Sequence, residues 1–350
     1  MVSAEDIAKI AGVSRSTVSR VVNNYSNVPE ETRRRVMEVI EKQGYVPQAS
    51  ARLLAGSANR TIGLYIVNRS RYYQDTISAS SFFTPFTTMI CDHVNRMGYH
   101  LLIAQYVDDT SLGRFRDLLS SRAIAGAILM GARNDDPRII ALAKEGFALG
   151  IIDQAPRDRK NPLGSAVIAN FDNHEGAATA LRHLYSLGHR TIAHVAGNQL
   201  IHSGKTRLEG FLDAARETGL DSSTLSIVDG NFSETQGREV AIKLLSGKNP
   251  PTAVFAGNDE SALGVLQAAH ELDIRIPDAL SVIGFDDIEL ARYVHPTLTT
   301  IGADKHELAA RITENLIAAI EGRRTVDRDI EVPVHLIERQ STARLKSKGK

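Results

Sequence analysis

The chain has 350 residues, which is long enough for a small domain together with a larger core of one or two domains. Its 41 basic and 41 acidic residues cancel, so the charge of the whole chain predicts no polyanionic partner. The single cysteine, Cys91, excludes an intramolecular disulfide and suits a reducing compartment. Residues 1–6 lack a secretion signal, and no apolar run reaches the roughly 18 residues of a membrane span, so we expect a cytoplasmic protein with no membrane partner.

The first 22 residues predict two short helices joined by a turn. Ser3, with Asp6 three residues later, is a short relative of the capping box that begins a helix. Gly12 can take the backbone through a turn that is closed to most other residues. Ser14 is a good N-cap for the second helix.

The second helix has an apolar face and a polar face. The apolar residues that recur at helical spacing are Val18, Val21 and Val22. The residues left on the other side are Arg15, Ser16, Ser19 and Arg20. An arginine can donate two hydrogen bonds to a guanine edge in the major groove, and small hydroxyl residues allow a close approach to DNA. The pattern predicts a helix-turn-helix motif that reads DNA.

A third helix is expected from Pro29 to the residue before Gly44, with a buried stripe of Val36, Val39 and Ile40. The run of Arg33, Arg34 and Arg35 could contact phosphates or form a solvated face, and the residues leave this open. Residues 1–60 carry nine basic and six acidic residues, a net charge of +3, so specific contacts must supplement the electrostatic attraction to DNA.

Residues 47–56, PQASARLLAG, favour a helix that is too short to be stable alone in water. We expect it to become ordered only against a partner. The alternative is a plain linker that packs Leu53 and Leu54 on the core.

From residue 61 onward, short apolar runs alternate with helical stretches. The runs are residues 62–67, 101–104, 127–130, 148–152, 166–168, 191–195, 253–256 and 280–283. This alternation predicts parallel sheets covered by helices, an α/β architecture. The segment is too long for one typical domain, so we expect two doubly wound subdomains.

Polar side chains follow three of these runs. Asp153 follows residues 148–152, Asn258 follows residues 253–256, and Asp286 follows SVIGF. Ligands of such folds bind beyond the carboxyl ends of the strands, which here means a cleft between the subdomains. Carboxylates accept hydrogen bonds and amides both donate and accept, which suits a sugar or polyol.

Signatures of enzymes, metals and cofactors are poor. HSGKTR has the wrong glycine spacing for a phosphate-binding loop, and no G-x-S-x-G elbow is present. His183, His189 and His194 lack the spacing of a helical zinc site. Adjacent carboxylates such as Asp286 and Asp287 point apart at a strand end and do not suggest catalysis. We therefore expect no catalytic residues, no metal and no cofactor.

Several motifs, in order along the chain, now resemble one family. These are DIAKIAGVSRSTVSRVVNN, VPEETRRRVMEVIEKQGYVPQASARLLAG, LGHRTIAHVAG, TRLEGF, NDESALGVL, SVIGFDD and PTLTTI. Together they resemble the lactose/galactose repressor family of bacterial transcription regulators. The resemblance implies a core like periplasmic sugar-binding proteins, whose chain crosses between subdomains three times, here near Phe171, Ile301 and Val332.

The expected organisation is therefore an all-α helix-turn-helix domain (1–46), a hinge helix or linker (47–60), an effector-binding and dimerisation core (61–340) and a tail (341–350). The N-subdomain should comprise about 61–171 and 302–331, and the C-subdomain about 172–301 and 332–340. The tail has no apolar heptad, so no C-terminal coiled coil can form, and we expect a homodimer that reads an inverted repeat in double-stranded DNA.

The resemblance also implies residue roles. In the family the hinge helix pairs with its twin, and a leucine at the position of Leu54 wedges into the minor groove. The expected DNA contacts are Ser14, Arg15, Ser16, Thr17, Ser19, Arg20, Asn23, Ala51 and Leu54.

For the effector, the family places a ligand-holding arginine at Arg207 and aromatic side chains at Phe82, Phe83 and Phe232. The full expected set is Phe82, Phe83, Asp153, Arg207, Phe232, Asn258 and Asp286. Met130 stands where a family member has a polar contact, and the loop of residues 68–81 is longer than usual, which makes the alignment of Phe82 and Phe83 uncertain.

The leading hypothesis is a sequence-specific repressor of carbohydrate-utilisation genes controlled by a small sugar or polyol. The alternatives are a sugar-binding protein without DNA activity and a carbohydrate enzyme with a regulatory DNA-binding head. The N-terminal helices contradict the first alternative, and turnover of candidate sugars would discriminate the second.

Overall fold

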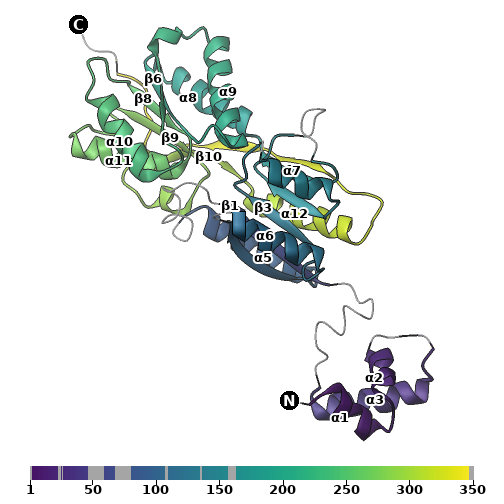
Figure 1. Cartoon of the computed structure of the whole chain (residues 1–350). Helices are drawn as coiled ribbons and strands as arrows, with labels where there is room; N and C mark the ends of the chain where they lie inside the picture. The colour runs from purple at the N-terminus through teal and green to yellow at the C-terminus, as the bar shows by residue number, and fades with distance from the viewer. Residues whose placement is uncertain are drawn as a thin grey trace. The chain divides into compact units, whose positions relative to one another are not determined.

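The computed structural model describes residues 2–22, 25, 27–45, 59–67, 80–106, 109–134, 136–156 and 163–346. Asn23, Ala51, Leu54, almost all of the expected hinge and nearly the whole 68–81 loop lie outside the described residues. Two units are described separately below, an N-terminal helical head and an α/β core (Figure 1).

The head consists of α1 (Ala4–Ala11), α2 (Arg15–Val22) and α3 (Glu30–Gln43). Ser3 and Asp6 form a complete capping box at the start of α1, and Gly12 ends it with φ 65°. The Thr17 amide donates to Ser14 Oγ at 3.1 Å, so Ser14 caps α2 as its sequence position predicts. The small apolar core comprises Ile7, Ala8, Ala11, Val18, Val21, Val28 and Val36.

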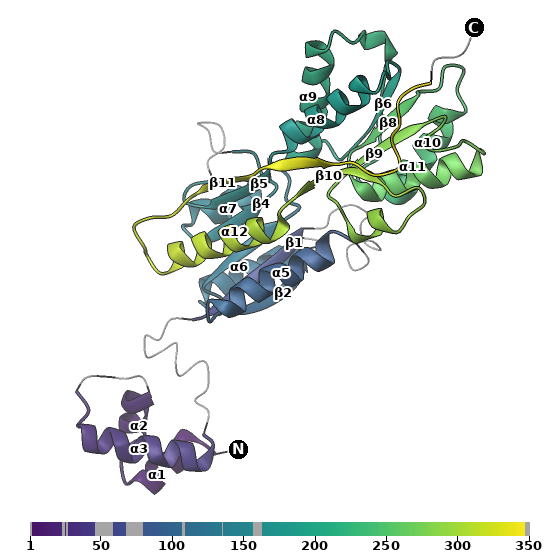
Figure 2. The ribbon, with the colours of Figure 1, turned by 180° about the vertical axis from the view of Figure 1, so that it is seen from behind.

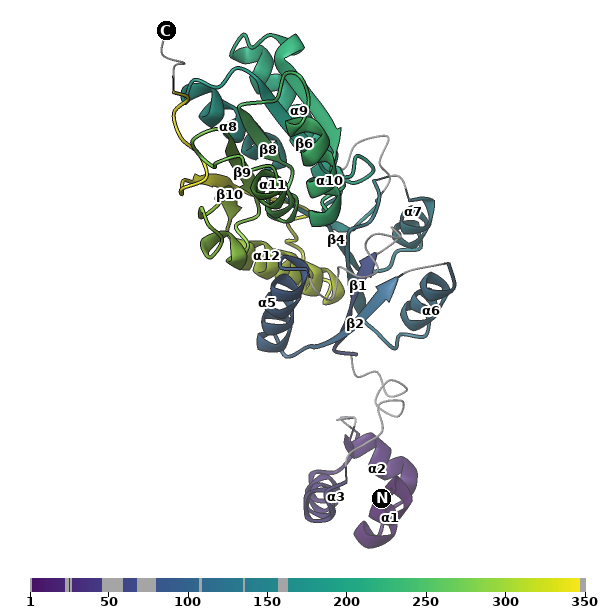
Figure 3. The same ribbon diagram turned by 90° about the vertical axis from the view of Figure 1, so that its left-hand side faces the viewer.

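The first sheet of the core has the strand order β11-β5-β4-β3-β1-β2. Its strands are β1 (Thr61–Val67), β2 (His100–Tyr106), β3 (Gly126–Met130), β4 (Leu149–Ile152), β5 (Val167–Phe171) and β11 (Asp329–Val332). Its helices are α5 (Phe83–Arg96), α6 (Asp109–Ser120), α7 (Pro137–Lys144) and α12 (Lys305–Ile320). Figure 3 shows α5 and α12 on one side of this sheet and α6 and α7 on the other. We call this sheet, together with its helices, the N-subdomain.

The second sheet has the order β12-β10-β9-β8-β6-β7. Its strands are β6 (Ile192–Ala196), β7 (Leu225–Asp229), β8 (Ala253–Ala256), β9 (Ser281–Phe285), β10 (Thr299–Ala303) and β12 (Val334–Ile337). Its helices are α8 (Asn173–Ser186), α9 (His202–Glu217), α10 (Glu234–Leu245) and α11 (Asp259–Glu271), with short 3-10 turns η1 (Ser222–Thr224) and η2 (Glu289–Arg292). The β12 strand pairs antiparallel with β10, whereas the other printed pairings are parallel. We call this sheet, together with its helices, the C-subdomain.

Close helix packing in the C-subdomain depends on glycine. A Cβ atom on Gly210 of α9 would lie 2.1 Å from the backbone oxygen of His174 on α8. The absence of that atom lets the two helices approach until their backbones touch, which forms one covering layer of the second sheet.

The chain passes between the subdomains three times. It crosses between β5 and α8, between β10 and α12, and between β11 and β12. Figure 2 shows the last crossing, where the C-terminal ribbon runs from β11 into the second sheet. The first sheet combines β1–β5 with the later strand β11, and the second combines β6–β10 with the later strand β12. Each subdomain is therefore discontinuous in sequence.

The segment after Gln340 differs from the expected tail. Ser341 is fully buried, and its hydroxyl donates to the backbone oxygen of Val282 at 2.6 Å. The His189 ring bonds to the backbone oxygen of Ala343, and the Leu345 amide donates to Leu187. Polar bonds rather than apolar periodicity hold this strap in place, so the core extends to Leu345.

In the described residues, no helix has the length and apolar character needed to span a bilayer.

Candidate functional site

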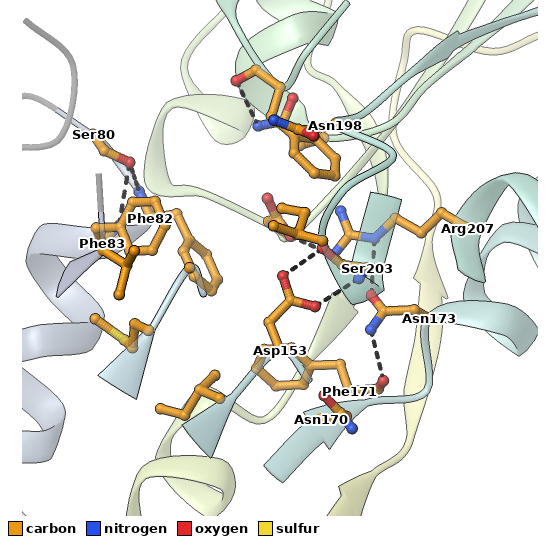
Figure 4. Close-up of a pocket in the computed structure, with 18 of the residues that line it drawn as sticks. Ser80, Phe82, Phe83, Asp153, Asn170, Phe171, Asn173, Asn198, Ser203 and Arg207 are labelled. Carbon is orange, nitrogen blue, oxygen red and sulfur yellow. Dashed lines mark hydrogen bonds and ion pairs between the residues drawn. The ribbon is translucent and has the colours of Figure 1, made fainter. Parts of the chain in front are cut away.

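A cavity of about 660 Å³ lies between the two subdomains, at the carboxyl ends of their parallel strands. It is lined by all seven residues expected at the effector site: Phe82, Phe83, Asp153, Arg207, Phe232, Asn258 and Asp286. Further polar lining comes from Ser80, Arg133, Asn170, Asn173, Asn198, Ser203 and Glu260, and apolar lining from Val67, Met130, Ile152, Phe171, Leu200 and Ile201. Figure 4 shows side chains from both sides converging on this space.

Arg207 is held rigidly in the cavity wall. Its side chain projects from α9 and is almost completely buried. Its guanidinium donates to Asn173 Oδ1 at 2.9 Å, to the Gly257 carbonyl at 2.5 Å and to Asp286 Oδ1 at 3.3 Å. It also stacks on Phe285 at 3.5 Å from the ring centroid. Three of its five N–H groups are thus used, which leaves two for further hydrogen bonds.

Asp286 is the acidic partner of Arg207. Burial raises the pKa of its carboxyl above the ordinary value, and the charges of Arg207 and Lys305 offset part of that rise. Its φ of 113° is unusual for a residue other than glycine, which indicates that its surroundings hold the backbone in place. The neighbouring Asp287 points elsewhere, to Arg292 and Arg339. The two carboxylates therefore diverge.

Asp153 reaches across the cavity from β4 of the N-subdomain to α9 of the C-subdomain. Its carboxylate accepts from the Ser203 amide at 2.6 Å and from the Ser203 hydroxyl at 2.7 Å (Figure 4). The N-cap residue of α9, Ile201, makes no side-chain cap. The cap of this helix consequently comes from the opposite subdomain.

Phe232 and Asn258 form another part of the wall. A Cβ atom on Gly197 would lie 2.0 Å from the Phe232 ring, so the ring occupies space that only glycine leaves free. Asn258 Oδ1 accepts from the Ser261 amide as the N-cap of α11, and its Nδ2 donates to the Phe232 carbonyl. Asn258 therefore positions Phe232 and has one amide hydrogen left for a further bond.

The N-subdomain wall around Phe82 meets Glu260 of α11. Glu260 Oε1 accepts from Ser80 Oγ at 2.9 Å and from the Ser81 amide at 3.0 Å. Burial raises the pKa of Glu260, and these two bonds lower it in part. The rings of Phe82 and Phe83 stand edge to face, with centroids 5.5 Å apart.

Asp259 is a buried acid behind the cavity. Its carboxyl accepts from Thr300 Oγ1 at 2.6 Å and from the Ile288 amide at 2.9 Å. Burial raises its pKa well above the ordinary value, with a further contribution from Asp286. It ties β10 and the segment after β9 to α11 and does not line the cavity. Across the described part of the chain, no cluster of three metal-binding side chains is found.

In the head, Arg15, Ser16, Ser19 and Arg20 are exposed on α2, while Val18 and Val21 are buried. Thr17 is half-buried, and Ser14 shares its hydroxyl with Ser16 and Thr17. From the arginine run of α3, Arg33 donates to the Tyr25 carbonyl, and Arg34 lies 4.0 Å from Glu38. The exposed face of α2 is thus polar, basic and presented by a small rigid core.

Comparisons with known proteins agree with this geometry. The "Bacterial regulatory proteins, lacI family" pattern matches residues 4–48, and a "Periplasmic binding protein-like domain" matches residues 181–342. The HTH-type transcriptional regulator DegA of Bacillus subtilis is 32% identical, over 97% of this chain and 98% of its own. The chain belongs to the lacI family.

Solved structures of relatives share the whole architecture of this lacI-family chain. The Lac repressor dimer bound to operator and the anti-inducer ONPF matches with TM-score 0.82 and 26% identity, over 98% of this chain and 99% of that one. A transcriptional regulator CelR–cellobiose complex matches with TM-score 0.71 and 26% identity, over 97% and 100%. This lacI-family protein is therefore a DNA-binding transcription regulator with a ligand-binding core, and not an enzyme.

Sequence reasoning missed several lining residues of this lacI-family core. Ser80, Ser203 and Glu260 make contacts between subdomains, and Asn173 orients Arg207. Glu260 lies two residues after Asn258, close enough to a strand end to have been considered. Ser203 and Ser80 carry no such signal, since their roles depend on how the subdomains meet.

Proposed function

We propose that this regulator is a repressor whose operator binding is controlled by a small hydroxylated effector in the cavity. The observation that carries the proposal is that one cavity joins acceptors and donors of both subdomains, with Asp153 on one side and Arg207 and Asp286 on the other. The paired acceptors and donors suit the hydroxyl groups of a sugar or polyol. Phe82, Phe83 and Phe232 offer apolar surface for its C–H faces.

Control follows from a preference for one arrangement of the subdomains. A ligand that binds two arrangements equally shifts neither, whereas one that bridges Asp153 and Arg207 favours the closed arrangement. The Asp153–Ser203 contact already stabilises closure without a ligand. The effector would therefore add to an existing bias rather than create the closed form.

On the DNA side, we propose a homodimer that reads an inverted repeat with Arg15, Ser16 and Arg20. Ser14, Thr17, Ser19 and Asn23 would support these contacts, and Ala51 and Leu54 would act in the minor groove. This symmetric reading requires two heads, so assembly and operator recognition are linked.

The test is a pair of cavity variants, Arg207→Ala and Asp286→Ala, with Arg216→Ala as the control. Arg216 lies on the same helix α9 but is exposed. An operator selected from random DNA is titrated by fluorescence anisotropy, with and without a panel of neutral sugars and polyols. We expect both cavity variants to bind the operator and to ignore the effector, while the control responds like the wild type.

Removal of Arg207 leaves Asp286 buried without its cation, so the melting temperature of each variant is measured alongside. Operator binding by the variant itself reports an intact head and dimer. A cavity variant that responds at the wild-type effector concentration shows that the proposed pocket is wrong.

A further inference from the structure

Glu260 differs from the other two carboxylates of the cavity. Asp286 is paired with Arg207, with 3.3 Å between Nη2 and Oδ1. Each oxygen of Asp153 already accepts one hydrogen bond from Ser203. Within the described residues, Glu260 lies within salt-bridge distance of no arginine or lysine, and its hydrogen-bond donors there are the hydroxyl of Ser80 and the amide of Ser81.

Only one oxygen of Glu260 is used. Both bonds from the N-subdomain end on Oε1, and Oε2 has no hydrogen-bond partner in the described part of the chain. An ionised carboxylate accepts and never donates, so Oε2 can take only a donor. Because Glu260 lines the cavity and is only half-buried, a ligand in the cavity can supply that donor.

The surroundings also oppose a second negative charge. Burial weakens the screening of charges by water, and Asp286 already disfavours ionisation of Glu260. A phosphate or carboxylate placed against Oε2 would meet a fixed carboxylate that no arginine or lysine of the described residues pairs with. A hydroxyl or an ammonium group would instead form a charge-assisted hydrogen bond.

We propose that Glu260 forms an acceptor subsite that admits neutral or amine-bearing sugars and rejects phosphorylated or carboxylated ones. This inference rests on the proposed function and adds the charge class of the effector. The subsite lies beside Phe82, since Ser80 Oγ also accepts from the Phe82 and Phe83 amides at 3.2 Å each. One ligand could therefore place its apolar face on an aromatic ring and a hydroxyl on Glu260.

The same residue would link selectivity to closure. Glu260 belongs to the C-subdomain, whereas Ser80 and Ser81 lead into α5 of the N-subdomain. An anion that displaced the Glu260 side chain would also break the two bonds to Ser80 and Ser81. A donor that binds Oε2 leaves them intact.

The decisive variant is Glu260→Gln. Its amide oxygen can still accept from Ser80 and Ser81, but an amide nitrogen replaces Oε2, so an acceptor becomes a donor without a change of size. The control is Glu239→Gln, which neutralises an exposed glutamate on α10 of the same subdomain.

Binding is measured by calorimetry at mildly alkaline pH, which favours the ionised form of this carboxyl, whose pKa burial raises. The probes are glucose, glucosamine, glucose 6-phosphate and glucuronate, galactose and galacturonate, and ribose and ribose 5-phosphate. We expect the wild type to bind the neutral or amine member of the best-binding set at least about tenfold more tightly than the anionic member. Glu260→Gln should lower the ratio of the affinity for the neutral or amine member to that for the anionic member by about tenfold. Glu239→Gln should leave this ratio unchanged.

A wild type that binds the anionic member as tightly as the neutral one overturns the subsite. So does an unchanged ratio in a Glu260→Gln protein that keeps the wild-type melting temperature. If wild-type binding responds to Arg207→Ala but the ratio ignores Glu260, the proposed function stands and only this inference fails. If no probe binds, the proposed function fails and the subsite fails with it.

Discussion

The contact between Asp153 and Ser203 should measurably couple the two subdomains. The perturbations are Asp153→Gly, Ser203→Ala and the double variant. Glycine is the matched replacement because Asp153 has φ 64°, a conformation that glycine adopts without strain, whereas alanine does not. Ser203→Ala removes the hydroxyl but keeps the amide that bonds to Asp153.

The expected magnitudes follow from the two bonds. The 2.7 Å hydroxyl–carboxylate bond is charge-assisted, and after discounting for the partial exposure of Asp153 we expect a coupling of about 1–2 kcal/mol. The 2.6 Å amide bond acts as a helix cap and adds about 1 kcal/mol to the loss in Asp153→Gly alone. That single variant should therefore lose about 2–3 kcal/mol in the free energy of unfolding.

The assay is urea denaturation of the effector-free protein, followed by circular dichroism because the chain has no tryptophan. The four proteins form a double-mutant cycle. A second cycle combines Ser203→Ala with Asp229→Asn, an exposed residue on the outer strand β7, and should be additive. A coupling below about 0.5 kcal/mol between Asp153 and Ser203 would refute the view that this contact stabilises closure.

Two further outcomes are expected. Arg20→Ala should weaken binding to the selected operator by about 1–3 kcal/mol and binding to random DNA by less, as measured by anisotropy at one fixed salt concentration. Equal losses on both DNAs would reassign Arg20 to phosphate contact. Burial lowers the pKa of His194 to about 4 from 6.5, so this ring is neutral in the fold but takes up a proton on unfolding below pH 6.5. Stability should fall by about 3 kcal/mol more in the wild type than in His194→Phe between pH 6.5 and pH 4, and parallel pH profiles from urea denaturation would contradict this.

Much of the fold could be predicted because local patterns determine it. The head follows from caps, a turn glycine and apolar spacing, and eight strands follow from apolar runs. The strands that these runs missed are β7, β10, β11 and β12. They are short and rich in threonine or charged residues, or half-exposed at a sheet edge, so their apolar signal is weak.

The residues of the candidate site also divide into those that local sequence patterns predict and those that depend on tertiary structure. Residues that follow strands reach one cavity because parallel strands end at one edge, and Asp153, Asn258 and Asp286 follow this rule. Ser203 and Glu260 meet partners 50 and 180 positions away in the chain, and such pairings depend on tertiary approach. Asn258 is predicted from the sequence only as a ligand contact, and in the structure it lines the cavity while its side-chain oxygen caps α11.

The three crossings between the subdomains set the order in which parts of this protein can fold during synthesis. The first sheet needs β11, the second needs β10 and β12, and these strands lie within residues 299–337; the second sheet also needs the strap that ends at Leu345. A ribosome must therefore release nearly the whole polypeptide before either half of the core can close, whereas the head needs only the first 45 residues and folds through near-neighbour contacts. Each growing chain would carry a finished DNA-reading head on an unfinished body for most of its synthesis. The two-headed recognition proposed above would then act as a safeguard, since a lone head on a nascent chain would be a poor match for a symmetric operator.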